Sequence, residues 1–148
     1  MITAIFVIVM MATLSAMILN VTGKTIKSTT QQYQKEQASL LARSYTELAI
    51  LYASSYERNA TNGCLETIQS HFGADAPNGY DIVTDIRYIG NQNALQFCTP
   101  VNVIQTLNGG TQFDQTISMI IDTYVYYRDF DDILNRDITF HRRTLQKL

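Results

Sequence analysis

The stretch MITAIFVIVMMATLSAMIL, residues 1–19, decides the fold of this chain, because it contains no charged residue, no proline and no glycine. The first charged residue is Lys24. A helix rises about 1.5 Å per residue, so this stretch would be about 28 Å long, close to the ~30 Å hydrocarbon thickness of a bilayer. A buried helix of a globular domain is usually shorter and polar on one face. The stretch therefore predicts a retained apolar helix suited to a membrane or a similarly apolar environment.

A cleavable signal peptide is the main alternative interpretation of the same stretch. A signal peptide needs a basic region, a short apolar core and a cleavage site made of small residues. Here no basic residue comes before the apolar run, the run is long, and residues 20–23 form only a weak cleavage site. These differences favour a helix that stays in the mature chain.

Length and charge limit what the rest of the chain can be. It has 148 residues, enough for one domain beside the helix, with a net charge of −2 and 16% charged residues. The only basic cluster is HRRTLQK, residues 141–147. Nucleic-acid binding would need a basic patch, so we expect no nucleic-acid partner. No motif indicates a cofactor.

Cys64 and Cys98 are the only two cysteines. On the oxidising side of a membrane they predict a disulfide, which would close a loop of about 35 residues and stabilise the domain by roughly 4 kcal/mol. Two free thiols are the alternative. A metal site is disfavoured, because neither cysteine belongs to a C-x-x-C pair or has a histidine at ligand spacing.

Residues 57–61, ERNAT, contain the N-glycosylation acceptor Asn59-Ala60-Thr61. The three-residue pattern alone is weak, but Glu57 stands two residues before the asparagine. This extended pattern resembles the acceptor of the bacterial N-glycosylation system of Campylobacter-like organisms. An ordinary polar helix end or loop is the alternative interpretation.

The segment after the apolar run indicates an amphipathic helix. An apolar stripe occurs at steps of three and four residues, and Arg43 and Glu47 lie off the stripe at pairing distance. Residues 23–34 are rich in Thr, Ser and Gln, and they fit either a polar linker or a continuation of the helix. An unbroken helix from Met1 to Ser54 would be about 80 Å long. The residues of the stripe are Ala38, Leu41, Tyr45, Leu48 and Tyr52.

The remainder of the chain indicates strands separated by turns. Residues 65–72 suggest a short helix, whereas residues 81–90, 94–99, 101–106, 116–128 and 137–143 predict strands, of which 116–128 is the longest. The predicted fold is α+β, with a long N-terminal helix packed on a small antiparallel sheet. The expected parts are an apolar helix (1–22), its amphipathic continuation (23–55) and a globular β-rich head (56–148).

The leading segment resembles that of the type IV pilins and pseudopilins. In that family the mature chain begins with a methylated phenylalanine, followed by an apolar segment of the form F-T-L-I-E-L. The stretch MITAIFVIVMMATLSAM is similar to this segment displaced by two residues, with Met1-Ile2 at the Leu-Ile pair. This implies that a Phe-Ser or similar pair precedes Met1 in the precursor. The small-residue and Leu-Ala-Ala positions are matched by Ala12, Leu14, Ser15 and Ala16.

The resemblance covers residues 1–55 in motif and the remainder in architecture only, and the chain departs from the family pattern in three ways. Thr3 stands where the family usually has an acidic residue, which pairs with a neighbouring subunit's terminal amine. Gly23 lies in a region where many pilins have a helix-breaking proline. The expected disulfide lies in mid-domain instead of closing a C-terminal loop. The first departure leaves a minor pilin or a type II secretion pseudopilin open.

The resemblance implies a structural, non-enzymatic subunit of an extracellular filament on the bacterial surface. The subunit would first lie in the inner membrane, be processed by a prepilin peptidase and be assembled with its own copies by inner-membrane machinery. Small residues would let helices approach closely, and Met10, Met11 and Met17 would fill irregular gaps. The residues expected in the filament core or membrane are Ile2, Thr3, Ala4, Ile5, Phe6, Ile8, Val9, Ala12, Leu14 and Ala16.

Two further interpretations belong to other classes. The first is a single-pass anchored periplasmic or extracellular binding module that never polymerises. The second is an enzyme, with Cys98 and His141 as a nucleophile pair, which a disulfide would exclude; His71 is the only other histidine.

An acidic turn is the one candidate metal site. Asp129, Asp131 and Asp132 form a weak candidate for Ca²⁺, because the segment lacks the glycine and the closing glutamate of an EF-hand loop. A solvated turn without metal is the favoured interpretation.

Overall fold

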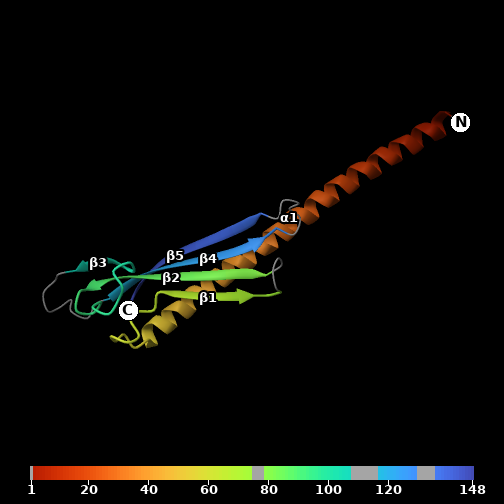
Figure 1. Ribbon diagram of the computed structural model, residues 1–148. Coiled ribbons are helices and arrows are strands. Elements are labelled where there is room, and N and C mark those ends of the chain that lie inside the picture. Colours follow the sequence, from red (N-terminus) through yellow and green to blue (C-terminus); the bar gives the residue numbers. More distant parts are fainter. Residues whose placement is uncertain (1, 75–78, 108–116, 130–135) are drawn as a thin grey trace. The chain divides into compact units, whose positions relative to one another are not determined.

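The computed structural model describes residues 2–74, 79–107, 117–129 and 136–148. One long helix is followed by a small, mainly antiparallel sheet, which is the α+β fold that the sequence predicts (Figure 1). The chain divides into two compact units, Met1–Glu36 and Gln37–Leu148, which are described separately. The elements of the described residues are α1 (Ile2–Ser55), β1 (Thr67–Phe72), β2 (Tyr80–Asn91), β3 (Val103–Leu107), β4 (Ile117–Arg128) and β5 (Asp137–Lys147).

Helix α1 runs for 54 residues without a break, so the polar-linker interpretation of residues 23–34 is wrong. No proline interrupts this segment, and the helix passes through Gly23. Hydroxyl side chains in the polar stretch bond back to the helix itself. Thr22 donates to the carbonyl of Ile18 at 2.9 Å, and Thr25 donates to that of Val21 at 2.9 Å. These bonds keep the side chains from capping or ending the helix.

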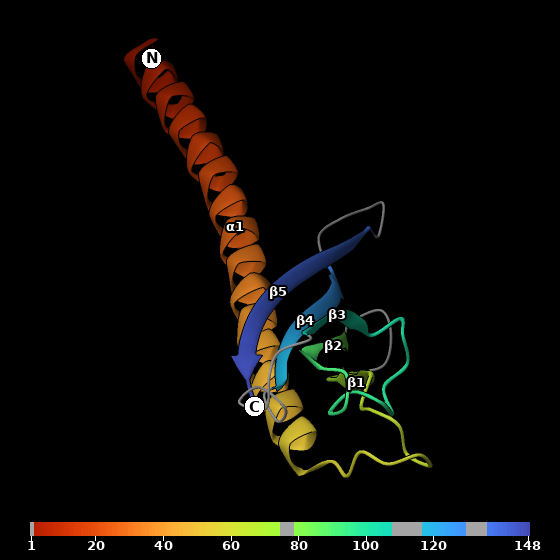
Figure 2. The same cartoon turned by 90° about the vertical axis from the view of Figure 1, so that its left-hand side faces the viewer.

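The sheet belongs to the second unit and has the order β1-β2-β4-β5, with antiparallel neighbours throughout this path. Strand β3 is the exception, because it pairs with β2 in parallel, beside residues 88–91 of β2. Strand β1 pairs with residues 80–85 of the same β2, so β1 and β3 share one edge of that strand. Figure 2 shows residues of α1 in this unit lying along one face of the sheet.

Three predicted strands, at 81–90, 116–128 and 137–143, correspond to β2, β4 and β5, and a fourth, at 101–106, overlaps β3. Two local predictions are wrong. Residues 67–72 form β1 instead of a helix, because β-branched Thr67 and Ile68 pair with the exposed edge of β2. Residues 94–98 are turn and not strand, since the carbonyl of Asn91 accepts hydrogen bonds from the backbone of Ala94 and Leu95.

The buried stripe of α1 shares only Ala38 with the predicted stripe. Leu41, Tyr45 and Leu48 of the predicted stripe are only partly buried, and Tyr52 is 50% exposed. Small side chains at the centre of the contact let the helix approach the sheet closely, and the larger ones lie beside this line. The residues of α1 buried against the sheet are Ala38, Ala42, Thr46, Ala49 and Ala53.

Hydroxyl groups join the helix to the sheet in the middle of the core. Thr46 and Thr123 lie 3.1 Å apart through their side-chain oxygens, and Thr84 donates to Thr123 at 3.3 Å. Apolar clusters lie on either side of this chain of threonines. Nearby, burial raises the pKa of Tyr88 to about 12, and its hydroxyl donates to the carbonyl of Leu65 at 2.7 Å. These four hydroxyl groups are thus paired with other groups of the protein.

We predict that Ala42→Leu destabilises the second unit by about 2 kcal/mol, because Ala42 is fully buried and a larger side chain would push α1 from the sheet. Ser44→Leu is the matched control, since Ser44 is exposed on the same turn of the helix, and it should change stability by less than about 0.5 kcal/mol. Urea unfolding of the detergent-solubilised chain, followed by tyrosine fluorescence, measures both. Equal effects of the two substitutions would contradict the close contact.

Candidate functional site

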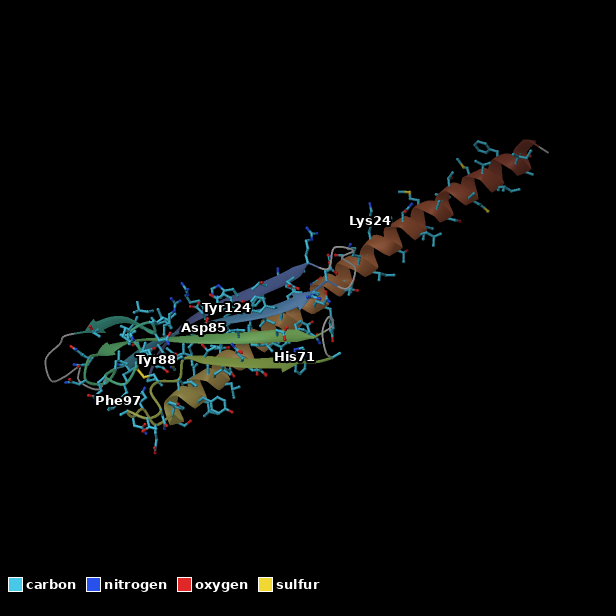
Figure 3. All side chains as sticks on the ribbon, in the orientation of Figure 1. Lys24, His71, Asp85, Tyr88, Phe97 and Tyr124 are labelled. Atoms are coloured by element: carbon cyan, nitrogen blue, oxygen red, sulfur yellow. A yellow bond between two sulfur atoms is a disulfide. The ribbon has the colours of Figure 1, made fainter. Side chains whose placement is uncertain are left out.

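The apolar start of α1 is exposed along its whole described length. Every side chain from Thr3 to Thr29 is exposed, including Phe6 at 64% and Leu19 at 74%. Figure 3 shows these side chains projecting outward from the helix up to Lys24 and beyond. Monomeric soluble proteins rarely expose a contiguous apolar surface of this extent. The surface therefore has the character of a docking or membrane surface.

Three polar side chains within this apolar segment donate hydrogen bonds to the helix itself. Thr13 donates to the carbonyl of Met10 at 2.9 Å, Ser15 to that of Met11 at 2.8 Å, and Asn20 to that of Ala16 at 3.1 Å. An unpaired hydroxyl in an apolar medium would cost several kcal/mol, whereas these need no water. In the part of the chain that the structure describes, α1 is also the one helix long and apolar enough to cross a membrane.

The expected core residues all lie on α1, which begins at Ile2, and those from Thr3 to Ala16 belong to this exposed segment. Ala12 and Ala16 are four residues apart, so they are neighbours on one face of the helix, whereas Ala4 lies about two turns before Ala12. Met10, Met11 and Met17 are 55–67% exposed. Sequence reasoning identified this segment, and the structure adds that its hydroxyls are internally bonded.

The predicted disulfide is present between Cys64 and Cys98, with Cα atoms 4.8 Å apart. Just before Cys64, the side-chain oxygen of Asn59 accepts hydrogen bonds from the backbone of Thr61 at 3.0 Å and Asn62 at 2.8 Å. The carbonyl of Asn59 accepts a bond from the backbone of Gly63, whose φ of 66° suits glycine. The acceptor sequence is therefore held in a tight turn tied to the disulfide.

A buried carboxylate lies on the face of the sheet opposite α1. The Asp122 side chain is 1% exposed, and its Oδ1 accepts bonds from His141 at 2.7 Å and from Arg143 at 2.7 Å. Arg87 of β2 donates to Oδ2. Burial alone would raise the pKa of Asp122, but the bonds from Arg143, His141 and Arg87 outweigh it and hold the pKa well below its usual value.

Sequence reasoning missed this cluster. The available signal was an aspartate in the middle of an apolar strand, ISMIIDTYVYYR, at a position that points away from the helix. Its three partners, Arg87, His141 and Arg143, come from β2 and β5, and only the register of the sheet brings them together. The cluster ties the three strands β2, β4 and β5 to one another. Its role is structural, because the carboxylate has no exposed surface for a ligand.

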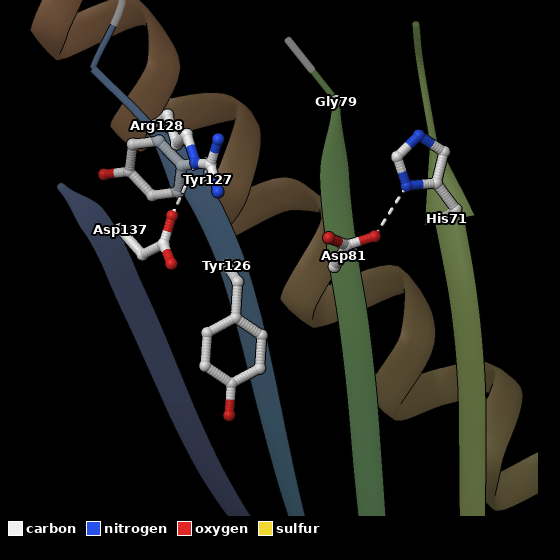
Figure 4. Close-up of a pocket in the computed structure, with 7 residues that line it drawn as sticks. All are labelled: His71, Gly79, Asp81, Tyr126, Tyr127, Arg128 and Asp137. Atoms are coloured by element: carbon white, nitrogen blue, oxygen red, sulfur yellow. Dashed lines mark hydrogen bonds and ion pairs between the residues drawn. The ribbon is translucent and has the colours of Figure 1, made fainter. Parts of the chain in front are cut away.

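Rings and ion pairs line the same outer face toward one end of the sheet. Tyr124 stacks on His141 with ring centroids 4.5 Å apart, and Tyr126 follows Tyr124 at 6.4 Å. A cleft of about 210 Å³ opens beside Tyr126 (Figure 4). Figure 4 shows the pair His71–Asp81 on one side of Tyr126 and the pair Arg128–Asp137 on the other.

Two further candidate sites from the sequence are the acidic turn and the nucleophile pair of Cys98 and His141. Asp129 is buried, whereas Asp131 and Asp132 lie outside the described residues. Among the described residues, no three carboxylate, histidine or cysteine side chains gather to hold a metal ion. Cys98 belongs to the disulfide, so the pairing of a Cys98 nucleophile with His141 is wrong.

Comparison of the chain with protein-family models, with curated proteins and with solved structures finds no match.

We predict that Asp122→Asn lowers the free energy of unfolding at neutral pH by about 2 kcal/mol. The half-exposed arginines can form hydrogen bonds to water instead, but the buried side chain loses the negative charge that pairs with them. Since the pKa of Asp122 is lower in the folded state, its contribution is present above about pH 4 and is lost as the pH falls further. Urea unfolding between neutral and acid pH should therefore show a shallower acid loss in the variant.

Asp85→Asn is the control for this prediction. Asp85 of β2 lies directly opposite Asp122 in the sheet. Its carboxylate accepts a hydrogen bond from the Thr67 hydroxyl of β1 at 3.0 Å and not from an arginine. Its substitution should change stability by less than about 1 kcal/mol. An Asp122→Asn variant as acid-sensitive as the unaltered chain would refute the role assigned to the carboxylate.

Proposed function

We propose that this chain is a structural subunit of an extracellular, type IV pilus-like helical filament, assembled by packing of N-terminal apolar helices. The observation that carries the proposal is the exposed apolar segment of α1, whose polar side chains are bonded internally. The resemblance of residues 1–55 to the pilins supports the same function. The proposed partners are other copies of the chain, the inner membrane before assembly, and the prepilin peptidase and assembly machinery of such filaments.

The energetics of the exposed segment require an apolar partner. About a dozen large apolar side chains between Ile5 and Ile26 are at least half exposed. Burying one such side chain contributes about 1.5–3 kcal/mol, so together they represent on the order of 20 kcal/mol of transfer free energy. A segment with this driving force would not remain in water as an isolated helix. Lipid and the helices of other copies are the two environments that could receive it.

Packing features favour other helices as the final environment. Ala12, Ser15 and Ala16 form a face of small residues on which a neighbouring backbone could approach closely. The methionines beside them adapt to irregular contacts. Head-to-tail contacts between identical subunits do not close, and they generate a helical filament. Thr3 supplies a hydroxyl where the family usually has a carboxylate, so a minor pilin or a type II secretion pseudopilin remains the nearest alternative.

A membrane-anchored binding module is the alternative from another class. It would use the same helix to span a bilayer and would keep the second unit as a monomer outside. This alternative needs no face of small residues, whereas the filament does. Assembly of purified subunits into filaments therefore separates the two functions.

Asn59 is proposed as a glycan attachment site of the subunit. Its side-chain oxygen accepts hydrogen bonds from two backbone amides, and neither of these bonds uses the amide nitrogen, the atom that carries the glycan. Ala60 and Thr61 beside it are exposed. Attachment here would place the glycan on the surface next to the disulfide.

We predict that Ala12→Glu reduces filament abundance by more than about 100-fold, because each subunit would bury an unpaired carboxylate costing several kcal/mol. Thr29→Glu is the control, since Thr29 is exposed in the polar part of α1, and it should leave assembly within about threefold. Electron microscopy of cell-surface material measures both. Normal filaments from Ala12→Glu, or no filaments from the unaltered chain, would contradict the proposal.

We predict that Asn59→Gln removes a glycan-sized mass from the chain purified from its native cells. Asn62→Gln is the control, because Asn62 lies in the same turn without a Thr or Ser two residues later, and it should keep the mass. Glu57→Gln tests whether the acidic residue belongs to the acceptor. Intact-protein mass spectrometry measures all three, and an unmodified native chain would rule the attachment out.

A further inference from the structure

The residues that line the cleft beside Tyr126 have no part in the proposed filament function. It lies at one end of the outer sheet face, has a volume of about 210 Å³ and receives side chains from four strands (Figure 4). Its size suits a single ring better than a drug-sized molecule. The lining residues that carry the argument are His71, Asp81, Tyr126, Arg128 and Asp137.

Tyr126 provides an exposed apolar surface among polar side chains. It is 37% exposed, and its ring lies nearly parallel to that of Tyr124, at an interplanar angle of 17°. Tyr124 is itself stacked on His141 at an interplanar angle of 9°. The row of rings fixes the orientation of Tyr126 before any ligand arrives. Such preorganisation lowers the entropic cost of binding.

Two paired carboxylates form the sides of the cleft. Asp81 is held by His71 at 2.6 Å, and Asp137 is held by Arg128 at 2.7 Å, in both cases through Oδ1. The side chains of Asp81 and Asp137 are 68% and 63% exposed, respectively. Among the described residues, no hydrogen bond or ion pair engages Oδ2 of either carboxylate, so each can accept a hydrogen bond from a ligand.

The charge distribution selects the class of ligand. An anion would meet two exposed carboxylates, and an organic cation would meet the Arg128 guanidinium beside the ring. A metal ion needs more oxygen ligands than the described part of the cleft offers. A neutral ligand rich in hydroxyl groups can donate to both carboxylates without breaking either pair. A flat C–H face on that ligand would cover the Tyr126 ring.

We propose that this cleft binds a neutral saccharide, with one pyranose ring stacked on Tyr126 and its hydroxyls donating to Asp81 and Asp137. The proposal is independent of the filament function, because it uses only side chains of β1, β2, β4 and β5. A single ring covered on one face is expected to bind with only about millimolar affinity. Repetition of the site along a filament would raise the effective affinity through multivalency.

Saturation-transfer NMR on the full chain, in a detergent without a sugar headgroup, tests the proposal. The ligands are methyl glycosides of neutral hexoses and N-acetylhexosamines, with choline and inorganic sulfate as the charged comparisons. We expect at least one neutral glycoside to bind and both charged compounds to bind more weakly. No saturable binding of any glycoside, or tighter binding of choline or sulfate, overturns the proposal.

Substitutions locate the binding and separate it from folding. Tyr126→Ala should weaken binding by about tenfold and Tyr126→Phe by less than about threefold, because the ring and not the hydroxyl makes the contact. Asp81→Asn and Asp137→Asn, which keep the side-chain shape, should each weaken binding by about fivefold. Tyr52→Ala removes another exposed tyrosine, from α1, and should have no effect. Equal affinity of Tyr126→Ala and the unaltered chain would overturn the assignment, provided that both unfold at the same urea concentration.

Discussion

A single unbroken helix that must satisfy two environments constrains everything else in this protein. In the first unit, the side chains at the start of α1 are exposed and mostly apolar, and the hydroxyls of Thr13 and Ser15 are bonded to the helix itself. In the second unit, the same helix presents small residues that allow close contact with a sheet. The two halves differ in side-chain size and polarity, whereas the backbone hydrogen bonding of the helix is the same throughout. The size and polarity of the side chains therefore determine which environment each half of the helix suits, while the helical backbone stays the same.

Because α1 covers one face of the sheet only, the other face must be compatible with water and still specify how the strands pair. Asp122 contributes to the second requirement. It draws Arg87 from one neighbouring strand and Arg143 from the other, and a shift of either strand by one residue would move its partner to the opposite face. A buried carboxylate contributes little net free energy when paired, but it penalises mispaired sheets that leave it alone. The polar outer face thus favours one register over its neighbours.

Strong periodic signals made part of this fold predictable. The apolar run of α1 and the β-rich strands β2 and β4 dominate their segments, so their existence followed from pattern alone. The segment that forms β1 was mistaken for a helix, because it is short and its strand state depends on the edge of β2. The centre of the helix–sheet contact was also missed, since pattern reasoning favours large apolar residues, and close packing here selects Ala42 and Ala49. The Asp122 cluster and the cleft beside Tyr126 depend on strand register, which no local stretch of sequence determines.

The internal bonding of the hydroxyls gives the proposed transfer from lipid to filament its physical basis. The hydroxyls of Thr13 and Ser15 can keep the same hydrogen bonds in either environment, so these two groups need not be hydrated or dehydrated during the exchange. Lipid tails and neighbouring helices are similarly apolar, and the hydrophobic term therefore nearly cancels between them. What remains is the packing of helix against helix, in which small residues such as Ala12 allow close approach and methionines fill the gaps. The balance between membrane and filament would then rest on side-chain shape, which single substitutions in this segment can alter without unfolding the second unit.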